Sequence, residues 1–305
     1  QYAGVTGEVL PEIPKCCMVV ACADHGVYRQ KVSAYPQSTT VGMVKSYVDV
    51  KGASANALAH YCGAHMVVVD MGINADMSDV PGLLHKKIAF GTKDITEGAA
   101  MSRAEAIHAI EAGIEIAENK IKEGYRVFTV GEMGIANTTA SACILGAFNR
   151  WNAVEVTGRG TNISDARLLH KIEMVQKALD VNQPDPADGL DVLSKVGGFE
   201  FGCMTGVMLG AAANRCLTII DGFNSTASAF IAKALSEESV QYLMASHLSL
   251  EQAHRKSLKA IGLTEYIDLD IRLGEAVGAS IQKKILDMAI AVYKDGADKR
   301  TGVAE

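Results

Sequence analysis

Hydrophobic residues along this chain fall into short continuous runs that alternate with longer segments of helical period. Four of the runs are almost entirely Val, Ile, Leu, Met or Cys, as expected for strands that are buried on both faces of a parallel sheet. The predicted strands are 17–24, 65–73, 126–134 and 215–223, with weaker candidates at 154–160 and 241–249.

Helical segments with recognisable starts separate these strands. Ser102 and Glu105 have the spacing of a capping box ahead of an apolar periodic run that stops at Gly124. Further helices are predicted over 164–180, where Ser164 suits the N-cap, and over 276–294. The alternation of strands and helices predicts an α/β fold built on an open parallel sheet.

Several predicted strands end in an acidic residue that is followed closely by glycine. These residues are Asp24, Asp70, Glu132 and Asp221. Ligands of open α/β sheets bind beyond the carboxyl ends of the strands, so four such ends on one sheet favour a shared polar crevice. The alternative is that Asp and Gly only terminate the strands and begin the next turn.

Composition narrows the class of protein. The 305 residues are 49% hydrophobic and 21% charged, which is typical of a globular protein and excludes a disordered chain. The formal charge of -6, without a basic cluster, makes nucleic acid an unsuitable partner. No apolar run is long enough to span a membrane and no signal peptide is visible, although the sequence begins at Gln1 rather than Met.

The seven cysteines form no C-x-x-C pair, and most lie inside apolar runs. We interpret them as reduced core residues of a cytoplasmic protein rather than as disulfides or metal ligands.

Two glycine-rich segments, 131–139 and 157–165, each follow a predicted strand and precede a helix. Glycine allows close backbone approach, and free N–H groups at a helix start attract an anion. Neither segment has the spacing of a Walker loop or of a G-x-G-x-x-G dinucleotide loop. Together with Lys171, two turns into the second helix, they favour a monophosphate site.

A further cluster places Arg272 and Glu275 around a glycine at the mouth of an apolar helix. Taken alone, its spacing is that of an ordinary helix start with an acidic residue in the first turn.

Eight motifs in this order give the chain a specific resemblance. They are ADHGV (23–27), VSAYPQ (32–37), GEMGIANTT (131–139), TGRGT (157–161), GGFEFGCMTGVMLGAAA (197–213), DGFNSTA (221–227), SHLSLEQAH (246–254) and RLGEAVGA (272–279). From about residue 17 to 295, the chain resembles the nicotinate-nucleotide:dimethylbenzimidazole phosphoribosyltransferases, which make the lower-ligand nucleotide of cobamides. Members usually have a longer N-terminal helical segment.

The resemblance implies the catalytic residues. Glu275 matches the general base that takes the proton of the aromatic acceptor, whose other nitrogen then attacks C1′ of nicotinate mononucleotide. Burial beside Leu273 and other apolar groups should raise the pKa of Glu275 and make it a better base. Glu132 matches a second carboxylate, expected to stabilise positive charge on the ribose or to orient the nucleophile; the alternative is a strand-end turn former. The resemblance implies no metal and no organic cofactor.

It also implies a set of residues that hold the ribose phosphate: Gly134, Asn137, Gly158, Gly160, Lys171, Ser249 and Arg272. Two of these have alternative interpretations. Lys171 has the pattern of an exposed helix lysine, and Ser249 has that of an N-cap of a helix over 250–261, with Gln252 completing a capping box.

The aromatic base is expected against the segment 33–43, with Tyr35, Met43, Met133 and Leu273 around it and Met204 as a further candidate. Tyr35 and Met43 stand where smaller or more polar side chains are expected in this family. Methionine walls adapt to different flat rings and tyrosine stacks on small ones, so a phenol or p-cresol is an alternative acceptor. Core packing is the alternative role of the methionines, and a structural role is expected of His25.

For the whole chain, the resemblance implies a doubly wound, Rossmann-like large domain over 15–275. Residues 1–14 and 276–305 would contribute to a small helical domain. It implies a homodimer, or a heterodimer with a paralogue. Two other possibilities stay open: a partner subunit with little activity of its own, and a phosphorylase or base-exchange enzyme acting on a nucleoside monophosphate.

Overall fold

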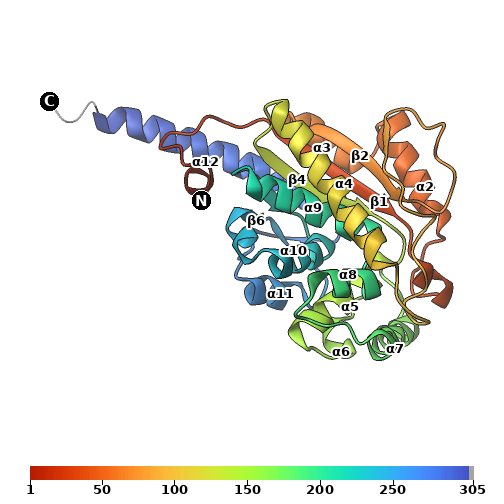
Figure 1. Ribbon diagram of the computed structural model, residues 1–305. Coiled ribbons are helices and arrows are strands. Elements are labelled where there is room, and N and C mark those ends of the chain that lie inside the picture. Colours follow the sequence, from red (N-terminus) through yellow and green to blue (C-terminus); the bar gives the residue numbers. More distant parts are fainter. Residues whose placement is uncertain (302–305) are drawn as a thin grey trace.

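A six-stranded sheet, parallel throughout, forms the centre of the computed structural model, which describes residues 1–301 and the side chains as far as residue 296 (Figure 1). The strand order is β3-β2-β1-β4-β5-β6. The strands are β1 (Cys16–Ala23), β2 (His65–Gly72), β3 (Leu83–His85), β4 (Val127–Met133), β5 (Leu217–Ile220) and β6 (Leu243–Ala245). Two further strands, β7 (His247–Ser249) and β8 (Ile267–Ile271), pair in a small parallel sheet of their own.

Helices cover both faces of the large sheet. One face carries α4 (Arg103–Lys122), α5 (Asn137–Asn149), α6 (Ala153–Val156), α7 (Asp165–Asn182), α8 (Gly189–Val196), α9 (Phe199–Ala213), α10 (Phe223–Leu235) and α11 (His254–Ile261). The other face carries α1 (Tyr2–Thr6), α2 (Ser38–Lys45), the π-turn η2 (Ser46–Val50), α3 (Ser54–Cys62) and α12 (Val277–Thr301). Two short 3₁₀ turns, η1 (Gly26–Gln30) and η3 (Glu237–Tyr242), complete the elements. This is the predicted doubly wound architecture.

Strand β1 shows how one strand serves both layers. Every residue of β1 is buried, and Cys17 and Val19 pack into the core under α9 while Met18 and Val20 pack into the core on the opposite face. Because alternate residues point to opposite sides of a sheet, a strand covered on both faces has no polar side. This confirms the prediction from the continuous apolar runs.

The four strong strand predictions are confirmed, but the two weak ones are not as predicted. The segment 154–160 is the short helix α6 followed by a loop, because Asn152 and Glu155 form a capping box that starts a helix. The segment 241–249 is divided between β6 and β7, which belong to different sheets.

The helix predictions hold where the sequence shows one polar face. The capping box of Ser102 and Glu105 starts α4, Ser164 caps α7, and α12 covers the predicted 276–294. Helix α9 has no polar stripe, because nearly all of it is buried between α4, α10 and the sheet. A helix that is apolar all round carries no amphipathic period to recognise.

The order of the strands places the ligand-binding edge. From β1, the chain continues to β2 on one side of the sheet, while β4 occupies the other side. In sheets of this order, the carboxyl ends of the strands beside the reversal leave a crevice. At this edge of the sheet, the loops that follow β4 and β5 line a common cavity.

The N-terminal segment lies beside α12. Lys294 of α12 forms an ion pair with Glu12, and α12 extends away from the body of the molecule (Figure 1). Tyr2, Val5 and Leu286 belong to the same hydrophobic core as one face of the sheet. A separate small domain stays a prediction, and residues 302–305 of it lie outside the described residues. No helix within residues 1–301 is both long and apolar enough to cross a membrane.

Candidate active site

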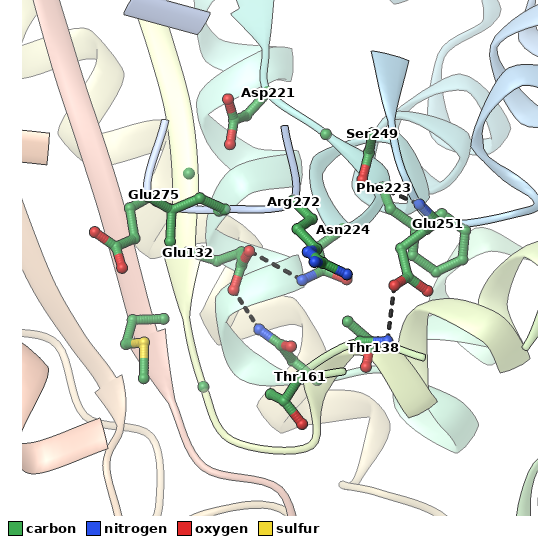
Figure 2. A pocket seen from close by; sticks show the side chains of 18 of the residues that line it. Glu132, Thr138, Thr161, Asp221, Phe223, Asn224, Ser249, Glu251, Arg272 and Glu275 are labelled. Atoms are coloured by element: carbon green, nitrogen blue, oxygen red, sulfur yellow. Dashed lines mark hydrogen bonds between the residues drawn. The ribbon is translucent and has the colours of Figure 1, made fainter. Parts of the chain in front are cut away.

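A cavity of about 540 Å³ opens at the carboxyl ends of β4 and β5 (Figure 2). This volume lies within the range of small-molecule sites. All predicted site residues line it except Gly158, Lys171 and the further candidate Met204. The residues that do so are Tyr35, Met43, Glu132, Met133, Gly134, Asn137, Gly160, Ser249, Arg272, Leu273 and Glu275.

The shared crevice predicted from four strand ends is only partly correct. Glu132 and Asp221 line the cavity, whereas Asp24 and Asp70 do not. The carboxylate of Asp24 accepts hydrogen bonds from the Thr40 hydroxyl and a backbone N–H, and Asp70 forms an ion pair with Lys87. The first two strands therefore use their acids to fix neighbouring loops.

Glu132 is held by two carboxamides. Asn137 Nδ2 donates to its Oε2, and Asn224 Nδ2 donates to its Oε1 at 2.9 Å. The Ser141 hydroxyl donates to Asn224 Oδ1 and so orients that amide. Burial raises the pKa of Glu132 to about 7, although the two amide donors favour the charged form. The carboxyl of Glu132 is thus held in one position in the cavity, and its pKa lies close to neutral pH.

Glu275 precedes the first residue of α12 and lies in the left-handed backbone region, with φ of 68°. It is therefore outside the first helical turn, contrary to the ordinary helix-start interpretation. The segment lies against β4, where a Cβ on Gly131 would come within 2.1 Å of the Ala276 nitrogen. A positive φ at a non-glycine residue is costly and is typical of functional sites.

The Glu275 side chain is 5% exposed, and its burial raises the pKa of the carboxyl. The nearby Tyr47 hydroxyl opposes this rise, although it stands outside hydrogen-bonding geometry. Figure 2 shows Glu275 and Glu132 neighbouring each other, with Asp221 on the same side of the cavity.

Asp221 is the third acid of this group. Its Oδ1 accepts the Ala279 backbone N–H at 2.9 Å, while its buried Oδ2 has no partner among the described residues. Burial raises the pKa of Asp221 well above its ordinary value. We call the side of the cavity formed by Glu132, Asp221 and Glu275 the acidic half.

Opposite lies a side built from loops and helix starts, which we call the anion half. Two helix N-termini line the cavity there, those of α5 and α10, with Thr138 in the first and Ser225 in the second. Gly160 and Thr161 of the loop 157–163 complete the wall. Unpaired N–H groups at helix starts favour a bound anion.

Lys171 lies beneath this wall rather than on it. Its side chain is buried, and Nζ donates to Thr138 Oγ1 at 2.8 Å and to the Gly158 carbonyl at 3.2 Å. Burial lowers the pKa of Lys171 to about 8, while the Glu251 charge acts in the opposite direction. The interpretation of Lys171 as an exposed helix lysine is wrong; its contact with phosphate stays a prediction.

Ser249 lines the cavity at the end of β7. Helix α11 begins only at His254, so Ser249 is not its N-cap. Gln252 does not complete a capping box but donates to the carbonyls of Val154 and Thr157. The chain makes a turn here, in which the Ser249 hydroxyl accepts the Glu251 N–H.

The four side chains predicted to surround the aromatic base all line the cavity. Met43 comes from α2 and Met133 from the end of β4, while Tyr35 and Leu273 are partly exposed at 54% and 43%. Met204 is fully buried in the core on α9, so the prediction that it joins these side chains is wrong. Met204 lies in the core because α9 is buried on all sides.

Some lining residues lay inside the quoted motifs without a predicted role. They are Thr138, Thr161, Asn224, His247 and Glu251. Asn224 is the clearest omission, because DGFNSTA marks it only as part of a helix start. His25 does not line the cavity; it is buried in a pair with Glu200. Burial lowers the pKa of His25, but Glu200 outweighs this and raises it.

Comparison with known proteins gives the family. A profile described as phosphoribosyltransferase matches residues 1–303. The chain is 45% identical, over all of its length and 86% of the relative, to the nicotinate-nucleotide–dimethylbenzimidazole phosphoribosyltransferase of Chloroflexus aggregans. The chain belongs to the nicotinate-nucleotide:dimethylbenzimidazole phosphoribosyltransferase family.

Further members of this family agree. The enzyme of that name from Geotalea uraniireducens is 44% identical over the whole chain and 87% of the relative. Crystal structures of the enzyme from Thermus thermophilus, one of them titled CobT, superpose with TM-scores of 0.90 and 0.92. Their sequences are 36% and 37% identical, and the match covers 96% of this chain and 87% of each structure. The chain is thus a phosphoribosyltransferase.

Proposed function

We propose that this enzyme transfers the phosphoribosyl group of nicotinate mononucleotide to 5,6-dimethylbenzimidazole or a related aromatic base. The products are an α-riboside 5′-phosphate and nicotinate, the chemistry needed for a cobamide lower ligand. The observation that carries the proposal is that the acidic half and the anion half face each other across one cavity. A phosphate on one side and a deprotonating carboxylate on the other are what this transfer requires.

The phosphate binds in the anion half. The residues that we assign to the phosphate line this part of the cavity: Gly134 and Asn137 at the start of α5, Gly160 in the opposite loop, and Ser249. Arg272 lies at the rim, where Nη1 donates to Asn162 Oδ1 at 3.4 Å, and it closes the site with a positive charge. Lys171 reaches the phosphate from beneath, and Gly158 gives its loop close packing.

Glu275 acts as the general base. It removes the N–H proton of the benzimidazole, and the other ring nitrogen attacks C1′ from the face opposite the nicotinate. A new C–N bond forms as the old glycosidic C–N bond breaks, so the configuration changes from β to α. The bonding electrons return to the pyridinium nitrogen, and nicotinate leaves with a neutral ring that needs no general acid.

Glu132 stabilises positive charge on the ribose during this displacement. Preorganised charge is most effective where no rearrangement is needed at the moment of reaction. The paired amides of Asn137 and Asn224 provide that fixation, because they hold both carboxylate oxygens.

A phenol or p-cresol is the second candidate acceptor. The observation that favours it is that Tyr35 and Met43 both line the cavity on its base-binding side. Glu275 would then take the O–H proton, and an oxygen would attack C1′. In such an enzyme, this chain would be the catalytic subunit of a heteromer with a paralogue.

We further propose a cytoplasmic dimer that requires no metal or organic cofactor. Exposed apolar side chains along α12, Met288, Val292 and Tyr293, support association through this helix. No three of the described His, Cys, Asp and Glu side chains gather in a way that would hold a metal ion.

The test is an acceptor panel. The purified chain is incubated with nicotinate mononucleotide and, in separate reactions, dimethylbenzimidazole, benzimidazole, phenol, p-cresol and orthophosphate. Release of nicotinate and the α-riboside phosphate are measured by liquid chromatography and mass spectrometry. We expect product with a benzimidazole. Product with orthophosphate alone would show a phosphorylase, and product only with phenols would favour the second candidate.

A further inference from the structure

The anion half contains an acidic side chain among its donors. Glu251, in the turn after β7, directs its carboxylate at the loop 157–163, where Oε1 accepts the Gly160 backbone N–H at 2.7 Å (Figure 2). Its Oε2 is buried and has no partner among the described residues. The contact is close, since a Cβ on Gly158 would lie 1.9 Å from that oxygen.

The groups that an anion needs surround this carboxylate. A Cβ on Gly160 would lie 2.7 Å from Thr138 Oγ1 and 3.2 Å from Lys171 Nζ. The backbone N–H, a hydroxyl and an ammonium thus converge near one residue, and the N–H is already bonded to Glu251. A carboxylate and a phosphate dianion repel each other, so both cannot occupy this position.

We propose that Glu251 competes with the substrate phosphate for the Gly160 N–H and that the phosphate displaces it, so that Glu251 is a specificity-determining residue. This inference rests on the proposed function, because it takes the 5′-phosphate as the ligand. An anion enters only if its bonds to the donors are stronger than those of the resident carboxylate. A dianion with several acceptor oxygens meets this condition, and weaker monoanions do not.

Glu251 has a second effect on the anion half. Its charge opposes the lowering of the Lys171 pKa that burial causes. The ammonium therefore keeps a counter-charge until the phosphate takes over that role.

Sulfate binding to Glu251→Gln tests the displacement. Sulfate is a dianion at every pH used, and calorimetry at about pH 6.5 keeps Lys171 charged in the wild type, given its pKa of about 8. We expect the variant to bind sulfate roughly tenfold more tightly, as removal of one like charge predicts. The matched control is Glu105→Gln, since the Glu105 carboxylate also accepts a backbone N–H but belongs to α4 and does not line the cavity.

Unchanged or weaker sulfate binding in Glu251→Gln would overturn the inference. A crystal of the wild-type enzyme with sulfate gives a second test that needs no variant. We expect sulfate on the Gly160 N–H and the Glu251 carboxylate turned away; Glu251 still bonded to Gly160, with sulfate elsewhere, would refute the displacement. The acceptor panel measures α-riboside formation separately. Failure of the sulfate tests therefore leaves the proposed function intact, whereas failure of the acceptor panel removes it.

Discussion

The two halves of the cavity treat buried charge in opposite ways. In the acidic half, burial raises the pKa of Glu132, Asp221 and Glu275 toward the neutral acid. In the anion half, burial lowers the pKa of Lys171 toward the neutral amine. The acids face the cavity directly, whereas the lysine supports the wall from beneath.

This difference indicates that the two halves have different functions. An acid that faces the substrate and whose pKa is raised by burial can exchange a proton with it. A lysine held behind a loop can strengthen an anion site but is not placed for proton transfer. We therefore expect changes in the acidic half to alter turnover and changes in the anion half to alter substrate binding.

The largest effect should come from Glu275→Gln, which keeps the shape and removes the base. We expect kcat to fall by roughly 10²- to 10⁴-fold, with binding of nicotinate mononucleotide nearly intact. Turnover and calorimetric binding are measured side by side, and Glu111→Gln on the exposed face of α4 is the control. Near-normal turnover of Glu275→Gln would remove the base role.

Lys171→Met should weaken substrate binding more than it slows turnover. The side chain keeps its volume but loses the ammonium, so we expect KM for nicotinate mononucleotide to rise roughly 10- to 100-fold with a smaller change in kcat. Lys177→Met, exposed on the same helix, is the matched control. An unchanged KM would contradict the phosphate role and end the distinction between the halves.

Glu132→Gln should reveal a stability cost that depends on pH. The pKa of Glu132 is raised from 4.5 to about 7, so the folded state binds its proton more tightly than the unfolded state. The stabilisation that this bound proton gives the folded state is fully present below pH 4.5 and is lost as pH rises through 7. Integrated over that interval it amounts to about 3 kcal/mol.

The amide variant does not titrate. Relative to wild type, its free energy of unfolding should therefore increase progressively from about pH 5 to about pH 8, as measured by urea denaturation. The same difference at every pH would show that the Glu132 carboxyl titrates normally. Such a result would contradict the raised pKa on which the description of the acidic half depends.

The smallest effect should come from the wall of the base site. Met43→Ala removes apolar contact from one side of the ring, so we expect the kcat/KM ratio between dimethylbenzimidazole and phenol to change by roughly tenfold. The KM for nicotinate mononucleotide should stay the same. If both acceptors lose activity equally, Met43 packs without selecting the base.

The sequence predicted what depends on local pattern. The runs that became β4 and β5 are apolar because both faces are covered, and their ends therefore located the cavity. Motif resemblance then supplied Glu132 and Glu275. Helix α9 escaped recognition because full burial removes the polar stripe on which helix prediction depends.

Other features depend on contacts between distant segments. Lys171 has the spacing of a surface residue, and only the loop packed over α7 buries it. Glu251 reaches Gly160 across 91 positions of sequence, which no periodicity reports. Asn224 becomes a partner of Glu132 only when the start of α10 meets the end of β4.

The backbone of Glu275 is wedged against Gly131, with α12 beginning immediately afterwards. A ribosome must therefore finish nearly the whole polypeptide before this carboxylate can take its place. Translation that stops short of residue 275 yields a chain that lacks both the Glu275 carboxylate and α12, the helix that covers one face of the sheet.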